Sequence, residues 1–329
     1  MNQRFRFLIQ VVVAIVSLLA ADQIAHLFGI HRAAGLLCLA SVATLVVCAR
    51  LGWRQAFLGV EGLALLSIPA ALSQNDPLRA TSVIALTAFA LGVCARWQLQ
   101  QVYWLLVVSV CLLITNSPFM GGPSGADLIR LASAISLSGV LTILLQTRLV
   151  PLDPSPVATP LFAVAHSWRR SAAYGLLLAS TAFVSTPMAV QHHWHITGLW
   201  LILTPFLVLR PSVRDAWKVA LHRSLGTVTG VLLVMVFALL LPKALPLQVP
   251  ALVVGVITAM IAMRRGHPAL VLMAFTVTIV LFNSNHVDLL RMADRRLEAV
   301  GLGVVLALGV MAIAHPIERR FAQSRVRES

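Results

Sequence analysis

The segment 195–230 carries the side chains best suited to bind a charged molecule. Four residues there recur at i, i+3, i+4 and i+7, the spacing of one helix face: Arg223, Gly226, Thr227 and Gly230. Small residues on such a face let a second helix approach closely, so Gly226 and Gly230 are predicted to pack helices. The planar guanidinium of Arg223 suits a carboxylate, with Thr227 beside it. The alternative is a topology anchor whose side chain reaches the lipid headgroups.

Two further arginines are candidates for the same chemistry. Arg210 ends the apolar segment before Arg223, and Arg296 lies in a charged segment, 291–298, that leads into an apolar helix. An arginine at such a position is costly unless protein or water surrounds it, so each is predicted to contact an anionic substrate. An interfacial cluster of ion pairs is the alternative for 291–298.

Four acids are candidates for carrying a proton. Asp22 and Glu61 stand alone in apolar helices, where a carboxylate must either pair with a cation or take up a proton. Asp294 and Glu298 recur at i and i+4, with Gly301 three residues further on the same face as a predicted packing residue. For Asp22 and Glu61, structural pairing with an arginine is the alternative.

Nothing in the sequence indicates a catalyst or a cofactor. The sequence contains no GxSxG, HExxH, GxxxxGK[ST] or CxxC motif. His192, His193 and His195 lie close together, but beside Trp194 and without a nearby Cys or acid they are typical of a membrane interface and not of a metal site. The four cysteines fall in apolar runs without ligand spacing. We therefore predict no enzyme, no metal and no cofactor.

Composition shows which elements must position these residues. Apolar residues make up 59% of the 329 residues and charged residues 11%, against about 25% in soluble domains, and the mean hydropathy is +0.90. A membrane-spanning helix needs about 20 mostly apolar residues. The charge-free runs are 7–21, 33–49, 62–75, 80–95, 97–126, 131–147, 171–209, 224–242, 244–263, 266–287 and 299–317. Reading 171–209 as two helices and 97–126 as one helix plus a loop predicts an all-α membrane protein with twelve spans.

The basic residues predict the orientation. If the N-terminus is cytoplasmic, 18 of the 25 lysines and arginines fall on cytoplasmic ends and loops, as the positive-inside rule requires. The exceptions are Arg32, Arg79, Arg130, Lys243, Arg291, Arg295 and Arg296. Both termini are then cytoplasmic, and the net charge of +14 reflects topology and contact with lipid, not binding of nucleic acid. The first apolar run is followed by Asp22, Gln23 and His26, which argues against a cleaved signal peptide.

The two halves of the chain resemble each other. At an offset of 164, His31, Trp53 and Gly62 fall on a His, a Trp and a Gly of the second half. This predicts six-helix repeats in parallel orientation at 1–150 and 168–316, a proline-rich cytoplasmic linker at 151–167 and a basic cytoplasmic tail at 317–329. The alternative is chance similarity between apolar sequences.

The segment 195–230 resembles the FUSC family, the fusaric-acid-resistance and aromatic acid exporter proteins. The resemblance rests on Trp200, on Arg210-Pro211 and on an R-x-x-G-T-x-x-G helix from Arg223 to Gly230. A later element from Arg296 to Gly301 is similar to a second family motif, with its Glu one position early. The specific match covers about 168–316. The first half matches in layout only, with Gly59 at the offset of Arg223, and the short linker leaves no room for the large cytoplasmic domain of many members.

The resemblance implies efflux of organic carboxylic acids, typically aromatic ones, across a bacterial inner membrane. The isolated acids Asp22 and Glu61 predict that protons drive this efflux. The resemblance also implies a homodimer and, in Gram-negative relatives, a periplasmic adaptor and an outer-membrane factor as partners. Two other functions remain open at this point: a passive organic-anion channel, and a non-transport envelope assembly protein.

Overall fold

The computed structural model describes residues 3–74, 76–97, 99–119, 121–150, 167–191, 195–209, 213–240, 247, 250, 254, 268–283 and 288–328. Within these ranges the chain is helical and contains no strand. The helices of the first part are α1 (Gln3–Leu27), α2 (Ala34–Leu51), α3 (Trp53–Leu72), α4 (Pro77–Cys94), α5 (Gln100–Thr115) and α6 (Gly125–Leu149). They are followed by α7 (Trp168–Gln191), α8 (His195–Val208), α9 (Val213–Leu240), α11 (Pro268–Asn283) and α12 (Leu289–Glu328).

Eight helices of the described chain are long and apolar enough to cross a membrane. They are Leu8–Leu27, His31–Ala49, Trp53–Leu72, Pro77–Trp97, Gly125–Leu149, Trp168–Gln191, Ala216–Leu240 and Leu289–Ile313. Because a helix rises 1.5 Å per residue, about 20 residues match the hydrocarbon core of a bilayer. The chain is therefore a multi-pass membrane protein.

Several helices begin and end where the charge-free runs predict. The run 171–209 forms two helices, α7 and α8, and the run 97–126 forms α5 followed by a loop. The helices α5, α8 and α11 have 16, 14 and 16 residues, shorter than a full span. The predicted span 244–263 lies mostly outside the described residues. The count of twelve spans and the tandem repeat therefore stay predictions.

The chain divides into two compact units, residues 1–199 and 200–329. The division lies later than the predicted linker at 151–167, which is almost entirely outside the described residues, because α7 packs extensively on α4 in the first unit. The division into compact units does not test whether the two halves of the chain are repeats of each other, so the repeat boundaries also stay predictions.

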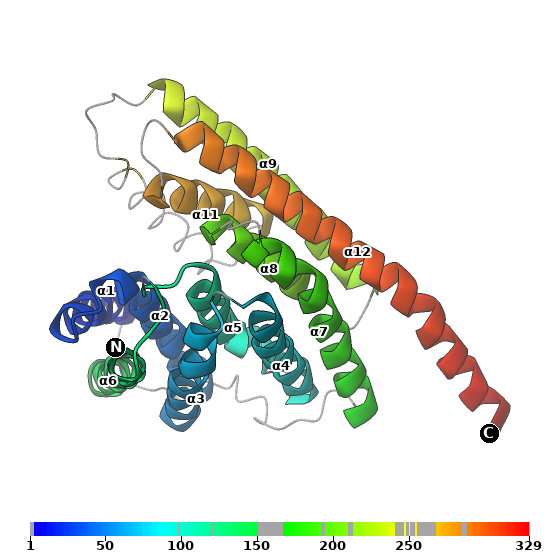
Figure 1. Ribbon diagram of the computed structural model, residues 1–329, viewed down its shortest axis with the longest axis horizontal. Helices are drawn as coiled ribbons and strands as arrows, with labels where there is room; N and C mark the ends of the chain where they lie inside the picture. Colours follow the sequence, from blue (N-terminus) through cyan, green and yellow to red (C-terminus); the bar gives the residue numbers. More distant parts are fainter. Residues whose placement is uncertain are drawn as a thin grey trace. The chain divides into compact units, whose positions relative to one another are not determined.

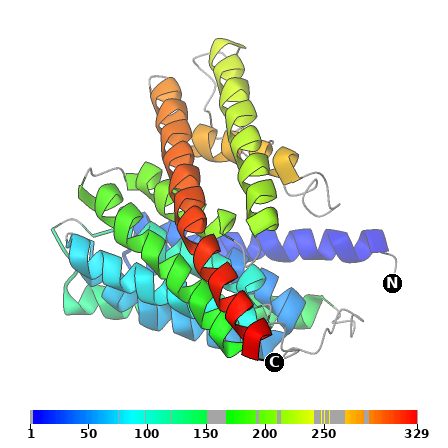
Figure 2. The ribbon, with the colours of Figure 1, turned by 90° about the vertical axis from the view of Figure 1, so that its right-hand side faces the viewer.

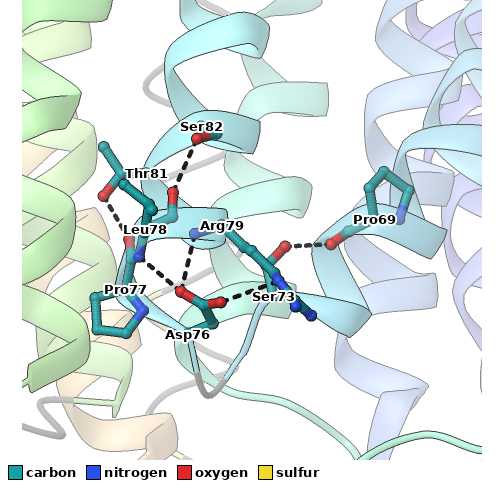
Figure 3. A network of polar contacts seen from close by, with 8 residues as sticks. All are labelled: Pro69, Ser73, Asp76, Pro77, Leu78, Arg79, Thr81 and Ser82. Atoms are coloured by element: carbon teal, nitrogen blue, oxygen red, sulfur yellow. Dashed lines mark hydrogen bonds and ion pairs between the residues drawn. The ribbon is translucent and has the colours of Figure 1, made fainter.

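In the first unit, polar contacts hold the end of α3 and the start of α4 (Figure 3). Asp76 precedes the first turn of α4, and its carboxylate accepts hydrogen bonds from the backbone N–H groups of Leu78, at 2.9 Å, and Arg79, at 3.1 Å. Pro77 follows at the first helical position, where its missing N–H costs nothing. A 3.0 Å ion pair joins Arg79 to Asp76. These contacts define Pro77 as the first residue of α4.

The helices α4 and α7 lie side by side (Figure 1), with backbones in contact at glycines. A Cβ atom at Gly175 of α7 would lie 2.7 Å from the carbonyl oxygen of Phe89 in α4, and one at Gly92 would clash with Gly175 itself. No side chain fits between the helices there. Small residues therefore allow this close crossing, as is usual inside membranes.

In the second unit, α9 packs against both α11 and α12 (Figures 1 and 2). The buried residues that join the three helices are aliphatic: Val231, Val234, Leu247, Val277, Val280, Leu281, Leu289 and Ala293. The helix α12 continues past the predicted tail boundary at 316 and ends at Glu328. The core brings Arg223 on α9 and Arg296 on α12 into the same unit as the second half of α8.

The N-terminal helix exposes a stripe of large apolar side chains. Leu8, Ile15 and Leu19 are 59%, 52% and 62% exposed, and Val12 and Val16 lie on the same side. Their spacing at i, i+4, i+7, i+8 and i+11 marks one face of a helix. Since lipid tails solvate apolar side chains, such a face is stable in a membrane and not in water.

Candidate anion site

The site begins on α8, where Trp200 and Thr204 lie one turn apart. Trp200 is 5% exposed and Thr204 is fully buried. The Thr204 hydroxyl donates a 2.6 Å hydrogen bond to the carbonyl oxygen of Trp200, a common arrangement for Thr in membrane helices. This bond orients the Oγ1 lone pairs away from α8 and makes them available as acceptors.

Arg223 of α9 uses those lone pairs. Its Nε and Nη2 both donate to Thr204 Oγ1, over 3.2 and 3.0 Å. Its Cζ lies 5.9 Å from the centroid of the Trp200 ring, within the range of a cation–π contact. The side chain is 3% exposed. Arg223 is therefore held inside the protein and does not extend to the headgroups as a topology anchor would.

Arg296 of α12 lies over the same ring. Its Cζ is 3.9 Å from the Trp200 centroid, so the guanidinium is in close contact with the indole, and the side chain is 4% exposed. Its Nη2 donates to Thr276 Oγ1 of α11 across 3.5 Å, at the long limit for a hydrogen bond. In the described part of the chain, its Nε and Nη1 are buried without a hydrogen-bond partner. Arg296 thus keeps two buried donors without a described acceptor.

Glycines set the distances between the helices of the site. A Cβ atom at Gly303 of α12 would lie 2.6 Å from the Cβ of Thr204, so α12 touches α8 there. On α9, a Cβ at Gly226 would lie 2.7 Å from the carbonyl oxygen of Ala269, and one at Gly230 would lie 2.8 Å from the Thr276 Cβ. Glycine at these positions lets the helices approach closely, so that Thr204 of α8 reaches Arg223 and Thr276 of α11 reaches Arg296.

The charge of this site is not neutralised by acids in the described chain. The ion pairs among described residues join Arg79 to Asp76, Arg130 to Asp127 and Arg291 to Asp288, and all are at least partly exposed. Neither Arg223 nor Arg296 pairs with a described carboxylate. Burying an ion costs several kcal/mol, and a desolvated cation–π contact returns about 2 kcal/mol. Two buried cations with so few partners make the site suited to an anion.

In the first unit, Glu61 of α3 lies half-buried against α6. The Ser136 hydroxyl donates a 3.1 Å hydrogen bond to its Oε2. Both residues line a groove of about 480 Å³ whose other lining residues are Ala64, Leu65, Ala132, Ser133, Leu137 and Val140. The N-terminus of α6 is defined by a reciprocal cap between Ser124 and Asp127, which sets the register of Ser136. Asp22 of α1 is also half-buried.

Comparison with known proteins identifies the segment that contains the arginine site. Residues 178–310 match the sequence profile of the fusaric acid resistance protein-like family. This segment, called the FUSC region below, is therefore similar to that family, FUSC. No curated protein and no solved structure matches the chain. The matched segment includes Trp200, Arg223 and Arg296, so the candidate anion site lies wholly in the FUSC region.

The structure places the remaining predicted site residues of the FUSC region as follows. Thr227 is 3% exposed, on the same side of α9 as Arg223. Asp294 and Glu298 lie on the exposed side of α12, away from buried Arg296. Gly301 shares that exposed side, and open space surrounds it, because the close contact of α12 falls two residues later, at Gly303.

Some predictions lie outside the described residues. Arg210, His192 and His193 are among them, as is the side chain of His195. Among the described residues, no group of three or more His, Cys, Asp or Glu side chains is placed to hold a metal ion.

Sequence reasoning missed three residues that hold the FUSC-region arginines. Thr204 lies four residues after Trp200, so the helical period alone could have placed it beside that ring. Thr276 and Gly303 carry no such signal, because each contacts a helix that is distant in sequence. The joint contact of Arg223 and Arg296 with one indole ring was likewise not predictable from spacing.

Proposed function

We propose that the protein exports organic carboxylic acids, typically aromatic ones, across a bacterial inner membrane. The similarity of residues 178–310 to the FUSC family and the apolar helices support membrane transport of organic acids. The observation that carries the proposal is the pair of buried arginines on Trp200, neither of which has a carboxylate partner in the described chain. A low-dielectric interior that keeps such cations is suited to a substrate that supplies the missing negative charge.

In this proposal Arg296 makes the first contact with the substrate carboxylate. Its Nε and Nη1 lack hydrogen-bond partners among the described residues, so binding an oxygen there satisfies buried donors. Arg223 adds a second positive charge from α9, and Thr227 lies on the same face of that helix. Arg210, outside the described residues, is proposed as a further substrate-binding residue. The 3.5 Å contact with Thr276 is weak enough for Arg296 to exchange it for a substrate oxygen.

Protons drive the export in this proposal, with Glu61 as the foremost carrier. Its Oε2 accepts from Ser136, and Glu61 lines the groove between α3 and α6, so the carboxylate has a polar partner and an open side. Asp22 is the second candidate. Asp294 and Glu298, exposed on α12, are placed to exchange protons at the surface and not to contact the bound anion.

Transport assays on the purified protein in liposomes test this scheme. An imposed pH gradient should accelerate benzoate transport in the wild type, and Glu61→Gln should remove that acceleration. The matched control is Asp76→Asn, which makes the same acid-to-amide change at a helix cap where Asn serves equally well. Transport that does not depend on the pH gradient, in the wild type and in every variant, would indicate a passive channel. No transport of any carboxylate by intact protein would favour an envelope assembly protein.

The orientation and the partners belong to the same proposal. The distribution of basic residues supports a cytoplasmic location for both termini. A homodimer, a periplasmic adaptor and an outer-membrane factor are the proposed assembly. Crosslinking in intact cells, with mass spectrometry of the products, tests for each of these partners.

A further inference from the structure

We infer that the substrate bound between Arg223 and Arg296 is a dianion, a small molecule that carries two anionic groups. This inference rests on the proposed function, because it assumes that the site binds an organic anion. It goes further by choosing a substrate charge, which similarity to the family does not specify.

The first argument is charge balance within the second unit. Both guanidinium groups are at least 96% buried, since their exposed fractions are 3% and 4%, and neither pairs with a described carboxylate. Both contact the ring of Trp200, so their Cζ atoms are no more than about 10 Å apart and repel each other in a low-dielectric interior. A monoanion would leave one buried cation without an opposite charge. A dianion neutralises both.

The second argument is the distribution of hydrogen bonds. The neutral groups that contact the arginines are hydroxyls, Thr204 for Arg223 and Thr276 for Arg296, and a hydroxyl contributes no charge. Thr204 donates to Trp200 and accepts from Arg223, so its capacity is fully used. Among the described residues, Nε and Nη1 of Arg296 have no hydrogen-bond partner. Arg296 thus needs acceptor oxygens, while Arg223 has hydrogen bonds to a neutral hydroxyl and needs a counter-charge. One ligand with two separated anionic groups can supply both.

A matched pair of ligands tests the inference without any mutation. Terephthalate carries two carboxylates, and its monomethyl ester has the same ring with one of them neutralised. At about pH 7.5 ordinary carboxylic acids are ionised, so the two ligands differ by one charge. Ligand-dependent thermal stabilisation of the full-length protein in detergent gives both dissociation constants. We expect terephthalate to bind at least about tenfold more tightly, which corresponds to about 1.4 kcal/mol. Fumarate and monomethyl fumarate repeat the comparison on a smaller, non-aromatic frame.

Variants then assign the preference to the two arginines. Arg296→Gln should reduce the preference for the dianion to less than about threefold, because one counter-charge is gone. Arg291→Gln is the matched control: it removes the same charge from α12 at an exposed position and should keep the full preference. Equal affinity of wild-type protein for diacid and half-ester would overturn the dianion while leaving organic-acid transport in place. Failure of every carboxylate to bind or to be transported would overturn the proposed function as well.

Discussion

The contact between α12 and α8 predicts opposite effects for two glycines that lie two residues apart. A methyl group at Gly303 would lie 2.6 Å from the Thr204 Cβ, 3.0 Å from its Cγ2 and 3.2 Å from the carbonyl oxygen of Leu201. One at Gly301 would meet nothing within 4 Å. Both changes are Gly→Ala on the same helix, so helix propensity and composition are matched.

The magnitude follows from that geometry. Relief of a 2.6 Å Cβ–Cβ contact requires a backbone shift, because a Cβ atom is fixed to its backbone and rotation of the Thr204 side chain does not move it. Overpacking of this kind costs about 1–3 kcal/mol. Gly301→Ala lacks the clash and gains about 0.5–1 kcal/mol from the lower flexibility of alanine. We therefore expect Gly303→Ala to be destabilised and Gly301→Ala to be unchanged or slightly more stable.

The assay is thermal unfolding of both variants in the same detergent, followed by tryptophan fluorescence, together with a terephthalate titration. For a unit of this size about 1 kcal/mol corresponds to a few degrees of melting temperature. Gly303→Ala should melt several degrees lower and bind terephthalate more weakly, because displacement of Thr204 misplaces Arg223. If Gly303→Ala matched the wild type in both measurements, the close contact and its role in holding Arg223 would be refuted. A loss as large in Gly301→Ala would refute the assignment of the contact to Gly303.

Three further predictions concern the site, the coupling and the topology. Arg223→Lys keeps the charge but cannot repeat the paired donation to Thr204, so it should weaken terephthalate binding about tenfold, or about 1.4 kcal/mol. Unchanged binding would contradict a role of the Arg223 guanidinium in holding the anion. In the liposome assay, Asp22→Asn should reduce pH-driven export less than Glu61→Gln does, because Ser136 holds Glu61 beside the groove. If the double variant depended on the pH gradient as strongly as the wild type, both roles would be contradicted. In a background without native cysteines, single cysteines near Gly122 and His193 should react with an impermeant thiol reagent from the periplasm; labelling of cysteines at 155 or 324 from that side would contradict the predicted topology.

The sequence by itself determined the class of structure and part of the anion site. Charge-free runs of helix length predict membrane helices because the cost of burying backbone and charge depends on local composition alone. The break of 171–209 into α7 and α8 follows from a polar cluster in the middle of the run. The face that joins Arg223 to Thr227 and Gly230 follows from the helical period, since residues three, four and seven positions apart lie on one side of any helix.

Tertiary structure alone decided which residues meet Arg223 and Arg296. Trp200, Thr276 and Arg296 come from three helices that are far apart in the chain, and no spacing within one helix states which neighbour its polar face will meet. The choice between Gly301 and Gly303 shows the same limit. Both are small residues in one apolar helix, but only Gly303 faces Thr204, because the rotation of α12 about its axis is set by the packing of Val277, Leu281 and Ala293 in the core of the second unit. That same rotation buries Arg296 and exposes Asp294 and Glu298, so it separates the cation that can bind an anion from the acids beside it in sequence.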